Sequence, residues 1–252
     1  MRELERDHPD NPTLRCAVVG AGRMGHALAI ALREAGLGVE GPLGRSGRPA
    51  AAEVVLLCVP DAAIAGAAAE LEPGPLVGHC SGATGLDVLA PHEAFALHPL
   101  MTVPAQGRPA FAGAGCAVAG STPRALATAL ALAQALGLRC IEVADADRPA
   151  YHAAAALASN FLVTVEAAAE RLAATAAVPR ELLLPLARAA LENWGALGAR
   201  EALTGPITRG DEATVARQRE AVAARAPELL ELWDALAACT RVLADQPEAV
   251  PA

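Results

Sequence analysis

Aromatic residues make up only 2% of this 252-residue chain, and its basic residues form no cluster. Nucleic-acid binding needs a concentrated positive patch, and single strands also need stacking rings, so no nucleic-acid partner is expected. The formal net charge of -8 equally disfavours binding to an anionic membrane surface. No uncharged apolar run reaches the length of about 18 residues that predicts a membrane span, and residues 1–11 are charged. These absences predict a cytoplasmic protein whose ligands are small molecules.

Metal-ligand spacing is also absent, because the six cysteines include no CxxC pair and stand mostly in apolar segments. We therefore expect no metal site, and we expect the cysteines to be buried free thiols. Cys80 is the exception that we treat as a site residue, because His79 and Ser81 flank it. With 54% hydrophobic residues, the chain can bury one large core or two modest ones.

The segment 20–25, GAGRMG, is the most informative pattern that is present. An apolar strand candidate at 16–19 leads into it, and an alanine-rich helix pattern follows. In a dinucleotide-binding turn, the first glycine allows a tight turn, the second lets the backbone approach a pyrophosphate, and the third lets the helix pack against the strand. The N–H groups at the start of that helix then hold the phosphates, although an ordinary strand-to-helix turn is the alternative. The predicted turn comprises Gly20, Ala21, Gly22, Arg23, Met24 and Gly25.

Strand and helix patterns alternate through the first part of the chain. Strands are expected at 16–19, 39–43, 54–59, 76–79, 94–97, 116–119 and 140–143, and helices between them include 62–71 and 85–90. Pro42, inside the second strand, indicates an irregular edge. The alternation predicts an α/β fold, with a Rossmann-type doubly wound parallel sheet and right-handed crossovers over residues 1–147. From residue 148 the strand signal disappears, and helices are expected at 150–176, 180–195, 212–224 and 227–244. Asp211 is expected to cap the third of these helices. The domain 148–252 is therefore predicted to be all-helical.

The end of the second strand bears on the choice between NAD and NADP. A carboxylate there binds the adenosine ribose, whereas a cation binds the 2′-phosphate. Glu40 falls near the middle of the predicted strand, while Arg45 and Ser46 follow its end. We therefore expect NADP(H), with Arg45 and Ser46 at the phosphate and Arg23 or Arg48 as further cations. The alternative is that Arg45 is an ordinary solvated loop residue.

Polar residues follow three of the predicted strands, and ligands of doubly wound sheets bind beyond the carboxyl ends of the strands. Asp61 could contact the cofactor or cap the next helix. The histidines could be site residues or structural residues, and both interpretations stay open. The strand-end candidates are Val59, Pro60, Asp61, His79, Cys80, Ser81, Gly82 and His98.

The helical half carries a second group of polar residues. At 100° per residue, His152 and Ser159 lie about 20° apart on one continuous helix, and Asn160 lies about 80° from His152. This spacing predicts one polar patch, with a hydrogen bond between helices as the alternative. Thr204 and Arg209 lie in a glycine-containing connection between two predicted helices.

Together these motifs resemble a bacterial family that joins a Rossmann-like NADP-binding domain to a helical domain of unknown function. The resemblance covers nearly the whole chain. Its motifs lie at 20–25, 59–61, 79–82, 97–100, 151–160 and 204–211. The family is similar to the group containing ketopantoate reductase, pyrroline-5-carboxylate reductase and 6-phosphogluconate dehydrogenase. That similarity implies a homodimer with the helical domains at the interface.

Many members of that group place a general-acid lysine four residues before an asparagine. Asn160 matches the asparagine, but Ala156 stands at the lysine position, so His98 or His152 would have to supply the proton. The resemblance implies an NADPH-dependent reductase of a ketopantoate-like 2-keto acid. The residues expected to orient or bind this substrate are Cys80, Ser81, Gly82, Ser159, Asn160, Thr204 and Arg209, of which Arg209 could pair with its carboxylate.

Three other functions remain open from the sequence. An imine reductase of the pyrroline-5-carboxylate reductase type needs no lysine, because an imine can arrive already protonated. A deazaflavin could be the hydride acceptor. The chain could also be a non-catalytic NADP-binding sensor or assembly protein, since the glycine turn would be retained without the lysine.

Overall fold

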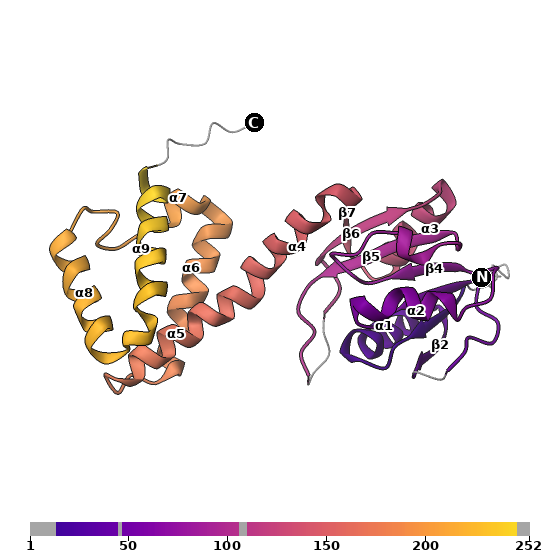
Figure 1. Ribbon diagram of the computed structural model, residues 1–252, viewed down its shortest axis with the longest axis horizontal. Helices are drawn as coiled ribbons and strands as arrows, with labels where there is room; N and C mark the ends of the chain where they lie inside the picture. Colours follow the sequence, from indigo (N-terminus) through magenta and orange to yellow (C-terminus); the bar gives the residue numbers. More distant parts are fainter. Residues whose placement is uncertain (1–13, 45–46, 106–109, 246–252) are drawn as a thin grey trace, which may run out of the picture. The chain divides into compact units, whose positions relative to one another are not determined.

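The computed structural model describes residues 14–44, 47–105 and 110–245, and contacts divide the chain into two compact units, 1–157 and 158–252 (Figure 1). Within the described residues, no helix combines the length and the apolar character needed to cross a membrane.

A seven-stranded sheet forms the centre of the first unit, in the order β2-β1-β3-β4-β5-β6-β7. All neighbouring strands pair in parallel except β5 and β6, which are antiparallel. The predicted Rossmann-type α/β fold is confirmed, but its sheet is mostly parallel rather than wholly parallel. The strands are β1 (Arg15–Val19), β2 (Gly38–Leu43), β3 (Val54–Leu57), β4 (Leu76–His79), β5 (Ala94–Leu100), β6 (Gly115–Gly120) and β7 (Arg139–Glu142).

Helices cover both faces of this sheet. On one face, α1 (Arg23–Glu34) and α3 (Pro123–Ala135) pack against side chains such as Val18 and Leu56. On the other face, α2 (Ile64–Ala69) packs against the side chains that alternate with these, such as Val55. This two-sided cover explains why β3 is an unbroken apolar run with every residue buried.

The strand β5 is longer than the predicted 94–97, so His98 lies inside it rather than after it. β6 pairs with β5 as far as Leu100, and His98 is opposite Ala117. β4 ends opposite Ala96, so Pro99 lies where the strand has a neighbour on one side only. The non-local partner β6 therefore extends the strand past its predicted end at residue 97.

The edge strand β2 is irregular, as Pro42 had suggested. The register with β1 shifts between Ala17 and Val19. Gly41 adopts a φ of +98°, which favours glycine. Farther along, the helices predicted at 62–71 and 85–90 are shorter than expected, because 3₁₀ turns occupy Asp61–Ala63 and Asp87–Leu89.

The first unit ends with α4 (Arg148–Ala156), and a π-helical turn at Leu157–Phe161 follows it. The described residues of the second unit contain helices and no strand, which confirms the predicted helical class. Asp211 caps α8 as predicted, because its Oδ1 accepts the N–H of Thr214 at 3.0 Å. The helices are α5 (Leu162–Ala174), α6 (Leu184–Leu197), α7 (Ala199–Ala202), α8 (Glu212–Arg225) and α9 (Leu230–Asp245).

Candidate cofactor and substrate site

The glycine turn has the geometry that each of its three glycines was expected to supply. Gly20 has a φ of +115°, and a Cβ there would overlap the carbonyl of Cys58. A Cβ on Gly25 would overlap the carbonyl oxygen of Gly20, where α1 lies against the turn. A Cβ on Gly22 would meet no atom within 4 Å. Gly20 and Gly25 are therefore required by the fold itself, whereas Gly22 leaves open space for a ligand.

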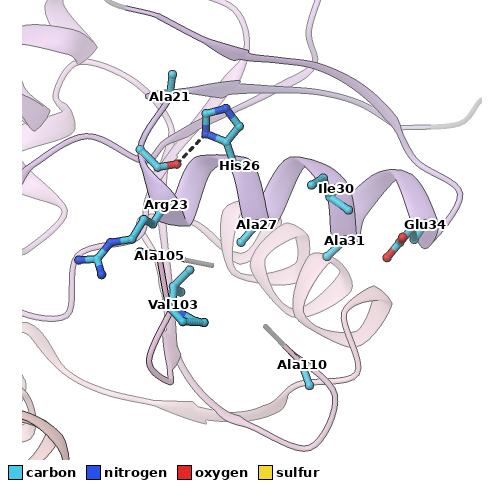
Figure 2. A pocket seen from close by; sticks show the side chains of 12 residues that line it. Ala21, Arg23, His26, Ala27, Ile30, Ala31, Glu34, Val103, Ala105 and Ala110 are labelled. Carbon is cyan, nitrogen blue, oxygen red and sulfur yellow. Dashed lines mark hydrogen bonds between the residues drawn. The ribbon is translucent and has the colours of Figure 1, made fainter. Parts of the chain in front are cut away.

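Open space and free N–H groups meet at the start of α1. A cavity of about 540 Å³ borders the turn at Gly22 and Arg23 and continues along α1 (Figure 2). Gly22 is the N-cap residue, and no side chain caps the helix, so its first N–H groups remain available. The first turn also carries no acidic residue. Such a helix start binds phosphate oxygens, so these residues fit a dinucleotide.

The carboxylate of Glu40 is engaged by the chain that follows β2. Its Oε2 accepts the N–H of Ala50 at 3.0 Å, so the carboxylate holds the connection between β2 and β3. Arg48, in that connection, is exposed. Arg45 and Ser46, which are predicted to bind the 2′-phosphate, lie outside the described residues.

A hydrogen-bonded network follows β4. Ser81 is buried, and its Oγ donates to Oδ2 of Asp61 at 2.8 Å. The same oxygen accepts the N–H groups of Ala83 and Thr84 at 3.2 and 3.0 Å. The 3₁₀ turn at Asp61–Ala63 has Pro60 at its N-cap and no side-chain cap, so Asp61 binds the next strand end instead of acting as the cap. The predicted residues after β3 and β4 are thereby brought together.

Three of the six histidines and the single tyrosine gather near the ends of β4 and β5. Nδ1 of His98 lies 2.8 Å from the hydroxyl of Tyr151, and the rings are edge to face. The ring centres of His98 and His152 are 6.2 Å apart. A Cβ on Gly82 would lie 2.7 Å from His98 and 2.9 Å from His152, so only glycine allows this approach. His79 is buried behind them, with Nε2 3.2 Å from the carbonyl oxygen of Gly85.

Burial sets the protonation of this histidine cluster. Burial, together with the neighbouring His152 and Arg148, lowers the pKa of His98 to about 4. Burial also lowers the pKa of His79. His98 is consequently neutral at pH 7, where its ring nitrogens can donate or accept a hydrogen bond but carry no positive charge.

The depressed pKa of His98 predicts a loss of stability in acid. The imidazole of His98 binds a proton near pH 6.5 in the unfolded state but only near pH 4 in the folded state. The protein therefore keeps its full free energy of unfolding above pH 6.5 and loses part of it as the pH falls from 6.5 to 4. The total loss from this residue is about 3 kcal/mol, because each unit of pKa corresponds to about 1.4 kcal/mol. Chemical denaturation at pH 7 and pH 4.5 should therefore show a smaller acid loss in His98→Asn than in the wild type. Equal losses in the two proteins would contradict this assignment.

The cysteines differ in their surroundings. Cys16 and Cys116 are buried free thiols as expected, but Cys239 is exposed. The Sγ atoms of Cys58 and Cys80 are 3.6 Å apart at the ends of β3 and β4. That contact, followed by burial, raises the pKa of Cys80 well above its usual value, so the thiol stays protonated. No group of three His, Cys, Asp or Glu side chains in the described part of the chain is placed to hold a metal ion.

The remaining predicted site residues lie in the second unit. Ser159 and Asn160 lie within the π-helical turn, where Asn160 is exposed. A π turn has about 4.4 residues per turn in place of 3.6, so the 100° increment behind the predicted polar patch does not hold there. Thr204 and Arg209 are exposed in the connection between α7 and α8. The roles of these four residues stay predictions.

Sequence reasoning missed Arg148, which is fully buried and opens α4. Its Nε donates to Oδ1 of Asp145 at 2.7 Å. The sequence offered one signal, the spacing of Arg148 from Tyr151 and His152. Residues three and four positions apart lie on the same face of a helix. A surface arginine beginning a helix has the same pattern, so its burial could not be read from the sequence.

Comparison with known families decides the classification. Residues 114–240, half of the chain, match the family described as "Domain of unknown function (DUF2520)", and residues 43–104 match a Rossmann-like domain. The chain belongs to the DUF2520 family. The resemblance inferred from the sequence motifs is therefore confirmed. In this DUF2520 protein, the matched span begins just before β6 and ends within α9.

Solved structures share the fold of this DUF2520 protein at low sequence identity. A proposed NADP oxidoreductase from Bacteroides fragilis has a TM-score of 0.79 and 20% identity, over 91% of this chain and 98% of that chain. A reductive aminase from Aspergillus terreus, in complex with NADPH and ethyl levulinate, has a TM-score of 0.62 and 18% identity, over 91% and 94%. A 1-pyrroline-5-carboxylate reductase from Streptococcus pyogenes has a TM-score of 0.57 and 11% identity, over 91% and 99%. None of the curated proteins matches the chain.

Proposed function

We propose that this protein is an NADP(H)-dependent oxidoreductase that reduces a small carbonyl acid of the 2-keto type. One observation carries the proposal: the glycine turn and His98 lie at the same edge of the sheet, where its parallel strands end. The open glycine turn follows β1, and His98 lies near the end of β5, which runs in the same direction. Ligands of such sheets bind along that edge. The structural likeness to a proposed NADP oxidoreductase and to a reductive aminase with NADPH supports the same class.

The residues of the cluster have separate parts in the proposed reaction. A bound, reduced nicotinamide supplies the hydride. Tyr151 holds Nδ1 of His98, and if its hydroxyl donates, the proton of the neutral ring resides on Nε2 and can hydrogen-bond a carbonyl oxygen. His152 is exposed, so it can exchange protons with solvent and deliver one to the product oxygen.

Reduction of an imine is the second candidate function, and the absence of lysine favours it. All 20 Lys-or-Arg residues of the sequence are arginines, so no lysine elsewhere in the chain can take the place of the missing one. An imine can arrive protonated and then needs only the hydride. The likeness to a reductive aminase and to a pyrroline-5-carboxylate reductase supports this alternative.

The preference for NADP(H) is also part of the proposal. Oε2 of Glu40 already accepts the N–H of Ala50, which leaves only part of this carboxylate to receive the ribose hydroxyls. Loss of nicotinamide absorbance should be followed with NADPH and NADH against panels of 2-keto acids and cyclic imines. We expect at least about tenfold greater kcat/KM with NADPH, the discrimination that a charge-assisted phosphate contact provides. Tight NADPH binding with no oxidation by any acceptor would instead identify a sensor.

We further propose a homodimer formed through the helical unit. Large apolar side chains there are more than half exposed, including Leu186 at 71% and Trp194 at 59%, which is unusual for a monomer. Sedimentation equilibrium should give twice the chain mass of 25.5 kDa. Leu186→Glu should shift the population toward monomer, whereas the control Ile141→Glu, on exposed β7 of the first unit, should not. A monomeric wild type at micromolar concentration would contradict this proposal.

A further inference from the structure

Arg148 is a buried charge with incomplete hydrogen bonding. Its side chain has no exposed surface, and its single ion pair joins Nε to Asp145, whose own side chain is 53% exposed. Nη1 and Nη2 are buried and have no hydrogen-bond partner among the described residues. A guanidinium in that state loses its hydration without full compensation, which natural proteins accept chiefly at functional sites.

The position of Arg148 ties it to the candidate reaction centre. Tyr151 and His152 are three and four residues farther along α4, so they occupy the same helix face about one turn, or 5.4 Å, away. Both side chains contact the ring of His98. The positive charge of Arg148 also contributes to the lowered pKa values of His98 and His79, which places it within electrostatic range of both rings.

The unpaired groups indicate the chemistry of the missing partner. Two Nη nitrogens of one planar guanidinium match the two oxygens of a carboxylate and form a bidentate pair with it. A histidine side chain carries no negative charge, so the nearby histidines cannot pair with these two nitrogens as anions, and Asp145 already occupies Nε. An anionic group that arrives with the substrate therefore supplies the charge that this site lacks.

We propose that Nη1 and Nη2 of Arg148 bind the carboxylate of the substrate, while its carbonyl lies against His98 and His152. This inference rests on the proposed reduction of a carbonyl acid and specifies which residue recognises the acid. It assigns to Arg148 the role that the sequence had predicted for Arg209. The substrate class is then a 2-keto acid or 2-imino acid, in which the carboxylate adjoins the reacting carbon.

The test uses oxamate and oxamide, two small amides that differ in one carboxylate. Calorimetric titration of the full protein, with and without NADPH, should show oxamate binding at least about tenfold more tightly than oxamide. Arg148→Met should abolish this preference without lowering the melting temperature, because a buried, poorly paired charge is replaced by an apolar side chain of similar length. Arg148→Lys keeps the positive charge but lacks the second nitrogen of the bidentate pair, so this variant should lose most of the preference for oxamate.

Several results would overturn the inference. An unchanged preference for oxamate in Arg148→Lys would exclude bidentate recognition, even if Arg148→Met failed to fold. If Arg209→Gln loses the preference for oxamate while Arg148→Lys keeps it, Arg209 and not Arg148 binds the carboxylate. If NADPH is not oxidised by any 2-keto acid while the oxamate preference still depends on Arg148, the proposed reaction fails and the carboxylate site stands.

Discussion

Gly25→Ala is expected to prevent stable folding of the first unit. The added methyl group would overlap the carbonyl oxygen of Gly20, a backbone atom that cannot rotate away. Gly20 is itself fixed between two strands, because its N–H donates to Leu43 at 2.8 Å and its Cα lies against Cys58. Relief requires α1 to move off the sheet, where Leu28 and Leu32 are fully buried. We expect a loss of at least about 3 kcal/mol in the free energy of unfolding.

Gly22→Ala should separate the fold from the binding of the cofactor. A methyl group there meets no protein atom within 4 Å, so the free energy of unfolding should change by less than about 0.5 kcal/mol. The same methyl group would occupy the space in which a pyrophosphate must approach the N–H groups of α1. We therefore expect the Kd for NADPH to rise at least about tenfold, measured by titration of nucleotide fluorescence.

Gly66→Ala is the matched control for both glycine variants. Gly66 is exposed within α2, and its added methyl group also meets no atom. The control should gain up to about 1 kcal/mol in stability and leave NADPH binding unchanged. If Gly22→Ala binds NADPH as tightly as this control does, the pyrophosphate does not lie on the turn.

His152→Asn is expected to cause the largest loss of turnover that leaves the fold intact. His152 is exposed on α4, so its replacement removes a proton donor without opening a cavity. We expect kcat to fall by about 10²–10⁴-fold with NADPH binding unchanged, the range typical for loss of a general acid. If the substrate is instead an imine that arrives protonated, the loss should be small, so this variant also distinguishes the two candidate reactions.

Tyr151→Phe tests the part played by His98. The change removes the hydroxyl 2.8 Å from Nδ1 and leaves the edge-to-face ring contact in place. Without this hydroxyl the imidazole of His98 is held less firmly in position. We therefore expect kcat to fall by about tenfold and KM for the carbonyl substrate to rise. The lowered pKa of His98 predicts that its own titration does not appear in the kcat profile between pH 5 and 8.

His92→Asn provides the control for the histidine variants. Its Nε2 lies 3.0 Å from the carbonyl oxygen of Ala68, away from the cluster, so kcat should remain within about twofold of the wild type. Unchanged turnover in both His152→Asn and His98→Asn would exclude this cluster as the reaction centre.

Several features could be predicted from local sequence because their causes are local. The roles of Gly20 and Gly25 follow from steric needs within one turn and a neighbouring strand, so the motif was sufficient to locate them. The strand predicted at 54–59 contains a continuous apolar run, which two covered faces require, and it forms over Val54–Leu57. The cap at Asp211 depends on three residues, and it formed as predicted.

Features that depend on distant partners could not be predicted in the same way. β5 extends to Leu100 because β6 pairs with it, whereas the predicted strand ended at residue 97. Glu40 is occupied because Ala50 folds back onto it. The π turn at Leu157–Phe161 changed the helical arithmetic for Asn160, and no local signal marked it.

The sequence by itself determined the fold class, the dinucleotide turn and the scarcity of acid–base groups: one tyrosine, six histidines and no lysine. Only the tertiary structure decided which of these groups meet. His98 and Tyr151 are 53 positions apart, and their contact requires β5 and α4 to be in place. The burial of Arg148 and the neutrality of His98 were decided in the same way. The physical reason is that dehydration and charge depend on the surrounding packed side chains, which local sequence does not specify.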